Sequence, residues 1–196
     1  MKKQRICVDM DDTMCDTVGE HLARYNAEHG VNVLREQFHG QWLWDFVPEE
    51  HRPFLKKTMS CDDFFEDLDV FPHAVRVLER LQQHYEIYIA TAAMIFPNSF
   101  ASKYRWLQRH VPFISSDQYV YCGDKSILHA DYLIDDIPGY LDRFMGQGVL
   151  FTQGHNVSNT KYPRVKDWLE VEEYFLPGGK ARTESGVPRA EERPQD

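Results

Sequence analysis

Three carboxylates in four positions follow a short apolar run near the start of the chain. The run covers residues 6–8, and the acids are Asp9, Asp11 and Asp12. It predicts a strand buried on both faces of a parallel sheet, with the acids at the carboxyl end, where such sheets bind ligands. Because Asp9 and Asp11 are two positions apart, an extended backbone points both carboxylates the same way. Their repulsion favours a hard divalent cation, foremost Mg²⁺, although an exposed acidic turn after an edge strand would also explain this stretch alone.

Other polar residues lie at the ends of later apolar runs: Thr91, Lys125, Asp135 and Asp136. Parallel strands of one sense end at one edge of a sheet, so these side chains are expected to converge with Asp9 and Asp11. A hydroxyl, an ammonium and several carboxylates suit phosphoryl transfer, because the cations neutralise phosphate oxygens and the hydroxyl donates a hydrogen bond. Asp9 could attack phosphorus, and Asp11 could protonate the leaving oxygen and then activate water. Taken singly, each residue is also explained as an ordinary surface acid, cap or cation.

The elements that must position these residues alternate along the chain. Apolar runs predict five strands, at residues 6–8, 87–92, 119–122, 132–134 and 149–151. Helical spacing of apolar residues predicts helices at residues 17–29, 72–81, 102–110 and 168–175. Such alternation indicates βαβ units. The fold class is therefore α/β, a three-layer Rossmann-like fold around a five-stranded parallel sheet.

Local signals bound the predicted helices. Thr17 and Glu20 have the spacing of a capping box, and Gly30 is a stop signal. Pro72 is expected in the first turn of the second helix. Tyr104 is expected in the core beneath the third.

Residues 31–70, here called the cap, differ from the rest of the chain. They are rich in aromatic residues, interrupted by prolines and without strand alternation. We expect short helices and loops, inserted after the first strand and helix, that cover the acidic strand end. Most of the aromatic side chains are expected to fill the cap's own core. The predicted division is an α/β core at residues 1–30 and 71–176, the cap, and a disordered tail at residues 177–196.

Composition narrows the classes of partner. The chain has 196 residues and a net charge of −9, which argues against a nucleic-acid duplex or an anionic membrane as partner. A small phosphorylated molecule remains compatible, because a metal can reverse the local charge. The 4 cysteines show no disulfide or zinc spacing, which favours a reduced, cytoplasmic protein. No apolar run approaches the roughly 18 residues of a membrane span.

The acidic motifs resemble those of a known superfamily. Residues 9–13 resemble the DxDx[TV] signature of the haloacid dehalogenase-like phosphatase superfamily. Thr91, Lys125 and the Asp135-Asp136 pair resemble its second, third and fourth motifs, in order and each at a strand end. Within that superfamily, the stretches at 8–16, 124–136 and 151–156 are similar to the 5'(3')-deoxyribonucleotidase family. The similarity runs from about residue 6 to residue 175 and is loose across the cap.

The resemblance implies roles for the acids. Asp9 would be the nucleophile that forms an aspartyl phosphate, and Asp11 would be the acid and base. Mg²⁺ would be held by Asp9, the backbone carbonyl of Asp11, and Asp136. Asp135 would orient this metal cluster.

The resemblance also implies substrate contacts. Thr91 and Lys125 would bind the phosphate. Lys103 lies near a family lysine that reaches toward substrate, although a surface role on its helix is an equal alternative. Trp42 and Trp44 lie near the aromatic cap residues that meet the nucleobase.

Some positions depart from the family pattern or have plainer explanations. Asp12 stands where many members have glycine, Thr17 where the mammalian type has an aromatic residue, and Ala92 where that type has a hydroxyl. These departures concern the substrate pocket more than the catalytic residues. His155 is interpreted as stabilising its loop, and Cys15 as a packing residue. A capping role for Asp16 and Thr17 is likewise sufficient.

The resulting hypothesis is a magnesium-dependent phosphomonoesterase of (deoxy)ribonucleoside 5'- or 3'-monophosphates. The first alternative is the same fold acting on sugar phosphates or other metabolites. A receiver-type signalling module fits less well, because it needs an acceptor aspartate at the end of an interior strand before the threonine, and residues 87–92 contain none. A homodimer is compatible with the sequence, which does not fix the oligomeric state.

Overall fold

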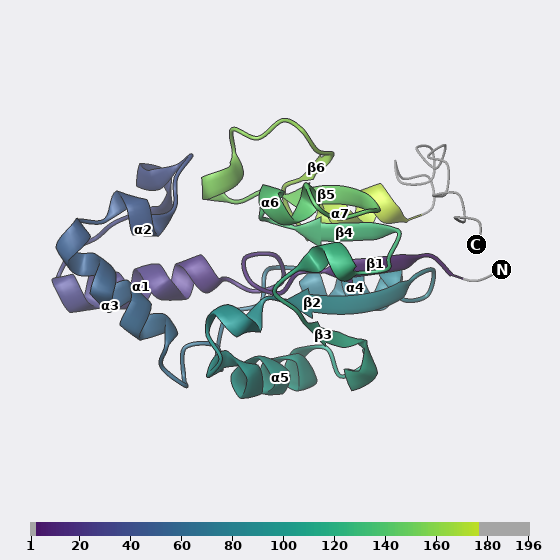
Figure 1. Cartoon of the computed structure of the whole chain (residues 1–196), viewed down its shortest axis with the longest axis horizontal. Coiled ribbons are helices and arrows are strands. Elements are labelled where there is room, and N and C mark those ends of the chain that lie inside the picture. Colours follow the sequence, from purple (N-terminus) through teal and green to yellow (C-terminus); the bar gives the residue numbers. More distant parts are fainter. Residues whose placement is uncertain (1–2, 177–196) are drawn as a thin grey trace, which may run out of the picture.

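A parallel sheet organises the computed structural model, which describes residues 3–176 of the chain (Figure 1). Its strands are β1 (Arg5–Val8), β2 (Glu86–Thr91), β3 (Tyr119–Tyr121), β4 (Tyr132–Asp135), β5 (Gln147–Phe151) and β6 (Arg164–Val165). All neighbouring pairs are parallel, in the order β3-β2-β1-β4-β5-β6. The α/β class and the parallel sheet are confirmed. The sheet has six strands rather than the predicted five. Strand β6 was not predicted because it is only two residues long and contains no apolar run.

Helices connect the strands and build the cap. The α-helices are α1 (Thr17–His29), α2 (Leu43–Phe46), α3 (Arg52–Met59), α4 (Ala74–Leu81), α5 (Ser99–His110), α6 (Pro138–Leu141) and α7 (Trp168–Phe175). Short 3₁₀ helices are η1 (Arg35–Phe38), η2 (Glu49–His51), η3 (Ala93–Ile95), η4 (Ser116–Gln118), η5 (Lys125–Ile127) and η6 (Gly154–Asn156). Within residues 3–176, no helix is both long and apolar enough to cross a membrane.

The alternation of side chains along β1 divides the core between the two faces of the sheet. Ile6 and Val8 join a large apolar cluster with side chains of α4, α5 and α7, whereas Cys7 joins a smaller one with Leu141 of α6 and Phe144. Each of the three β1 residues is at most 3% exposed. Burial on both faces explains why residues 6–8 of this strand are all apolar.

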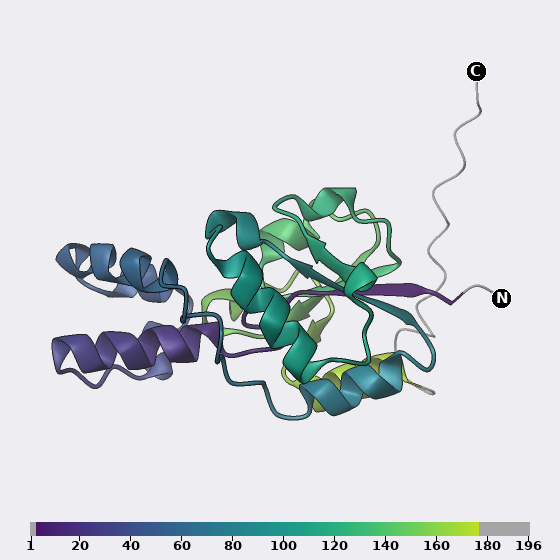
Figure 2. The same cartoon turned by 90° about the horizontal axis from the view of Figure 1, so that it is seen from below.

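The cap has its own apolar cluster. Leu22 and Tyr25 of α1 pack there with Leu55 of α3 and with Phe38 and Leu43. Figure 2 shows α1 and α3 side by side, projecting away from the sheet. The contacts therefore group α1 with the cap, while the division of the chain at residue 30 stays a prediction. The expected short helices without strand alternation are what the cap contains.

The segment that contains α1 and the cap begins and ends at a narrow connection, here called the neck, formed by residues 14–16 and 69–71. Cys15 forms an isolated antiparallel bridge with Val70. The amide of Asp16 donates to the carbonyl of Asp69 at 2.8 Å, and the amide of Phe71 donates to the carbonyl of Met14 at 2.9 Å. The chain thus leaves the core and returns to it through one hydrogen-bonded pair of segments.

Several local predictions need correction. The capping role suggested for Asp16 is confirmed, since its carboxylate accepts the amide of Gly19 at 2.8 Å, whereas the predicted Thr17 and Glu20 box does not cap α1. Gly30 stops α1 as expected, in a left-handed conformation with φ of 62°. Helix α4 begins at Ala74, so Pro72 lies before it rather than in its first turn.

The third predicted helix also differs in part. Helix α5 begins three residues before the predicted start, and its Trp106 and Leu107 are buried as expected. Tyr104 is 44% exposed and does not belong to the core. The predicted disordered tail lies outside the described residues.

Candidate active site

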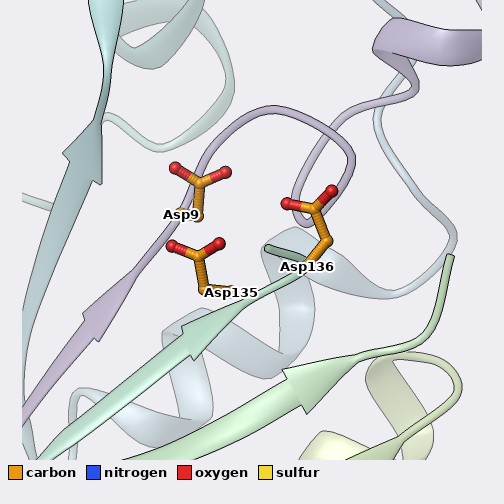
Figure 3. A group of neighbouring side chains, drawn as sticks. All are labelled: Asp9, Asp135 and Asp136. Carbon is orange, nitrogen blue, oxygen red and sulfur yellow. The ribbon is translucent and has the colours of Figure 1, made fainter. Parts of the chain in front are cut away.

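Three buried carboxylates gather where the strand order of the sheet reverses. Asp9 follows β1, Asp135 ends β4, and Asp136 comes directly after it, as Figure 3 shows. The chain builds β2 and β3 on one side of β1 and then crosses to place β4 on the other. Ligands of open α/β sheets bind at such reversals. One carboxylate oxygen from each acid lies within 4.8 Å of the others, so these acids, here called the acid cluster, could hold a metal ion.

Lys125 joins two acids of this cluster. Its ammonium donates to Asp9 Oδ1 and, at 2.5 Å, to Asp135 Oδ2. The lysine side chain has no exposed surface, and its Nζ lies 4.7 Å from the centre of the Tyr140 ring. The other oxygen of Asp135 accepts the amide of Ile137 at 2.8 Å. Residues from three separate parts of the chain therefore meet as the sequence predicted, and Asp135 is held at both oxygens.

Asp11 belongs to a neighbouring network. Thr17 donates to its Oδ1 at 3.2 Å, while Thr91 at 3.3 Å and the ammonium of Lys103 donate to its Oδ2. Lys103 also donates to the Thr91 hydroxyl at 3.0 Å and is only 3% exposed. The surface role considered for Lys103 is therefore wrong, while its contact with substrate stays a prediction. The Asp11 carboxylate is not a member of the acid cluster, so as a side chain it stands apart from the predicted metal ligands.

Burial dominates the electrostatics of the acid cluster. Desolvation raises the pKa of Asp9 to about 7, with Lys125 opposing the shift and the charges of Asp135 and Asp11 adding to it. Desolvation, then Asp135 and Asp9, raise the pKa of Asp136 well above its usual range. Burial would lower the pKa of Lys125, but the charges of Asp135 and Asp9 raise it above its ordinary value. Keeping all three carboxylates ionised therefore costs more free energy than one ammonium offsets, and a divalent cation would stabilise the ionised forms.

Long-range contacts hold the loop between β1 and α1. Asp12 adopts φ of 50°, in the left-handed region that favours glycine, and its carboxylate accepts the amide of Val18 at 2.9 Å. The side-chain amide of Gln153 donates to the carbonyl of Asp12 at 2.6 Å, and the indole of Trp168 donates to that of Thr13 at 2.8 Å. The departure from glycine at this position thus adds a helix-capping contact.

A pocket of about 230 Å³ lies over the acids. Its polar part is formed by Asp9, Asp11, Asp12, Thr17, Lys103 and Asp136. Its other side is mainly apolar and aromatic: Trp42, Met59, Phe65, Ala92, Ile95, Phe96, Ile137 and Tyr140. Thr91 and Lys125, predicted to bind the phosphate, lie outside this lining. Trp44, predicted beside Trp42 as a substrate residue, lies outside this lining, and the Arg52 guanidinium packs 5.9 Å from its ring centre.

The lesser candidates also have defined positions. His155 stabilises its loop as predicted, with Nε2 3.0 Å from the carbonyl of Asp136. Burial lowers the pKa of its ring to about 4. Cys15 is fully buried and desolvation raises the pKa of its thiol, in agreement with a packing role.

Two contacts escaped the sequence analysis. The hydroxyl of Thr17 holds Asp11, where we expected only a helix cap. The ring of Tyr140 lies against Lys125. The capping signal at Thr17 does not point to Asp11, and Tyr140 meets Lys125 only through the tertiary fold.

Comparisons with known proteins agree with this architecture. Over residues 3–181 the sequence matches the family described as "5' nucleotidase, deoxy (Pyrimidine), cytosolic type C protein". It is 42% identical over 175 residues to a Staphylococcus epidermidis protein provisionally named 5'(3')-deoxyribonucleotidase, covering 89% of this chain and 97% of that protein. It is 32% identical over 174 residues to the 5'(3')-deoxyribonucleotidase of Bacillus subtilis, covering 89% and 99%. A haloacid dehalogenase-like hydrolase of Streptococcus pneumoniae shares the fold, with a TM-score of 0.61 at 16% identity over 89% of this chain and 99% of that one.

Proposed function

Because the chain belongs to the 5'(3')-deoxyribonucleotidase family of haloacid dehalogenase-like hydrolases, we propose that it is a magnesium-dependent phosphomonoesterase of (deoxy)ribonucleoside 5'- or 3'-monophosphates. The observation that carries the proposal is the buried Lys125 between Asp9 and Asp135, beside Asp136, at the reversal of the strand order. Family membership also removes the receiver-type alternative.

The proposed reaction has two steps at Asp9. A carboxylate oxygen of Asp9 attacks phosphorus, the ester P–O bond breaks, and Asp11 gives its proton to the departing nucleoside oxygen. Water then attacks the phosphorus of the aspartyl phosphate while Asp11 takes up its proton, which releases inorganic phosphate and restores Asp9. The separate hydrogen-bond network of Asp11 supports a role distinct from that of Asp9.

The donor set of the acid cluster fits a hard divalent cation. Lys125 contacts only two of the three carboxylates, and the imidazole beside the third, 3.4 Å from Asp136 Oδ2, is neutral at pH 7. We propose that Asp9, Asp136 and the carbonyl of Asp11 hold Mg²⁺, whose oxygen preference they match, while Asp135 orients the cluster. Bound Mg²⁺ would supply positive charge against the phosphate oxygens.

The remaining polar residues would bind the phosphate. Lys125 places one buried ammonium group against Asp9, and Lys103 places another against Asp11. Thr91 adds a hydroxyl that already contacts Lys103 at 3.0 Å. Donors fixed before substrate arrives stabilise developing charge without reorganisation.

The apolar part of the pocket supports a substrate with a flat ring. Trp42, Phe65 and Phe96 face the same cavity as the acids. Aromatic side chains gain stability by stacking on planar groups, whereas a sugar phosphate presents mostly hydroxyls that need hydrogen-bond partners. We therefore place the nucleobase against Trp42 and keep sugar phosphates as the second candidate.

A panel assay tests the proposal. Phosphate release is measured with deoxyribonucleoside and ribonucleoside 5'- and 3'-monophosphates, with sugar phosphates alongside. We expect the highest kcat/KM with nucleotides. A clear preference for sugar phosphates would transfer the function to the second candidate.

Location and assembly are part of the same proposal. The cysteines at positions 7, 15, 61 and 122 are unpaired, which supports a reducing, cytoplasmic setting. A homodimer stays a prediction, and sedimentation analysis of the full chain measures it.

A further inference from the structure

A single histidine joins the cap to the metal-binding end of the core. The rings of His155 and Trp42 stack with centroids 3.7 Å apart and planes 11° from parallel. The same imidazole lies with Nε2 3.0 Å from the carbonyl oxygen of Asp136. Because a carbonyl only accepts, Nε2 must carry the hydrogen of this bond. His155 therefore contacts the wall of the pocket with its face and the backbone of an acid with its edge.

The two partners of His155 differ in how firmly the rest of the protein holds them. Trp42 is 41% exposed, so few other contacts fix its ring. The carbonyl of Asp136 also accepts from the side-chain amide of Asn156 at 2.7 Å. Loss of the histidine would therefore free the indole far more than it would free the Asp136 backbone.

The junction between cap and core does not depend on this ring pair alone. The amide of Gly40 donates to the carbonyl of Gly154 at 2.8 Å, one residue before His155. Substitutions at positions 42 and 155 leave this backbone bond in place. The ring pair can therefore be altered while the cap stays docked at this point.

We propose that His155 is a positioning residue: its imidazole fixes the indole of Trp42 as one wall of the substrate pocket, in register with Asp136. The proposal rests on the proposed function, in which that wall meets the nucleobase. His155 itself is outside the lining of the pocket and acts through Trp42.

Two substitutions separate the two contacts of the ring. His155→Phe keeps an aromatic face for Trp42 and removes the hydrogen bond, whereas His155→Gln keeps a donor and removes the face. We expect His155→Gln to raise KM for a nucleoside monophosphate about three- to tenfold, the size of one lost aromatic pair. We expect kcat within about twofold of wild type, and KM of His155→Phe near the wild-type value. Equal KM in the two variants would overturn the proposal.

A double-mutant cycle tests whether the effect passes through the indole. In a Trp42→Leu background, His155→Gln should add no further increase in KM. The matched control uses Trp44→Leu as the background in place of Trp42→Leu, since Trp44 has the same exposure of 41% but does not line the pocket. Additive increases in KM would show that His155 does not act through Trp42 and would overturn the proposal.

A spectroscopic measurement keeps the proposal separate from the identity of the substrate. In a Trp44→Phe background, acrylamide quenching reports mainly on Trp42, because Trp106 and Trp168 have no exposed surface. We expect a larger quenching constant for His155→Gln than for His155→Phe, with no substrate present. If no nucleotide is hydrolysed but this difference is seen, the proposed function fails and the positioning role stands. Equal quenching constants would reject the positioning role whatever the substrate.

Discussion

The acid cluster and the cap are built on opposite principles. At the sheet edge, Asp9, Asp135, Asp136 and Lys125 are at most 4% exposed. Lys125 bonds Asp9 and Asp135 directly, and Asp136 lies within 4.8 Å of both acids. In the cap, the apolar cluster around Leu55 belongs to no strand, and the tryptophans beside it are 41% exposed. Groups proposed to meet the phosphate are thus fixed by the parallel sheet, whereas groups proposed to meet the rest of the substrate are carried by a separate unit. The difference indicates that chemistry and recognition can be altered independently.

The strongest test of this separation is Asp9→Asn. The amide keeps the shape of the side chain but is no nucleophile, so we expect turnover to fall roughly a thousandfold or more. The melting temperature should change little, because Lys125 retains Asp135 as partner. Asp67→Asn is the control, since that side chain is 77% exposed. Substantial activity in Asp9→Asn would exclude Asp9 as the nucleophile.

Removal of metal is the second test. A chelator should stop phosphate release and added Mg²⁺ should restore it. Mg²⁺ at a hundred times its Kd should raise the free energy of unfolding by about 2.7 kcal/mol, and Asp136→Asn should abolish that increase. Asp142→Asn, outside the cluster, should keep it. Rates unchanged in chelator would rule out the metal site.

Lys125→Met compares the buried charges with charges at the surface. Without its ammonium, the acid cluster is left with uncompensated buried carboxylates, so we expect the free energy of unfolding to fall by about 3–5 kcal/mol without metal. Lys161→Met removes an ion pair whose lysine side chain is 64% exposed and should leave stability unchanged. Urea denaturation measures both. Similar midpoints for the two variants would contradict the picture of a tightly coupled cluster.

A pH titration addresses the cap. Burial lowers the pKa of His21 from 6.5 to about 4, and its Nε2 bonds the carbonyl of Leu55 at 3.0 Å. The unfolded chain binds this proton below about pH 6.5, so the stabilisation is complete above that pH and is lost as the pH falls toward 4. At pH 4 the free energy of unfolding should be about 3 kcal/mol lower than above pH 6.5 because of His21.

The control for this titration is a pair of variants. His21→Gln should remove the contribution of His21 to the pH dependence of the free energy of unfolding. His84→Gln, at an exposed position outside the cap, should leave that contribution in place. Wild-type and His21→Gln profiles that run parallel between pH 6.5 and 4 would show that His21 is not the titrating group.

The sequence alone was sufficient to predict those elements of the fold that a single uninterrupted segment of the chain forms. The strands that end in Asp9, Thr91 and Asp135 are apolar runs, because a strand buried on both faces needs apolar residues at every position. Strand β6 was missed because two residues paired at a sheet edge need no such run. The exposed Tyr104 shows the converse limit, since helical spacing does not say which face of a helix the core covers.

The contacts within the site were harder to predict. Thr17 and Asp11 lie on one loop, but their hydrogen bond depends on the left-handed turn at Asp12, where sequence alone suggests a departure from glycine rather than a function. The stack of Trp42 on His155 joins residues more than a hundred positions apart. Such pairings are set by how the cap docks on the core, and no local pattern encodes them.

The neck has a consequence for how this protein can change. Since Asp16 and Asp69 are hydrogen-bonded to each other, the span between the two ends of the intervening segment is the same whatever that segment contains. A longer, shorter or unrelated segment could follow Val18 without stretching the sheet, provided that Thr17 and Val18 still hold Asp11 and Asp12. The chain is therefore suited to exchange of the segment that we propose meets the nucleobase, so that substrate preference would change by insertion and deletion while the residues at the sheet edge are kept.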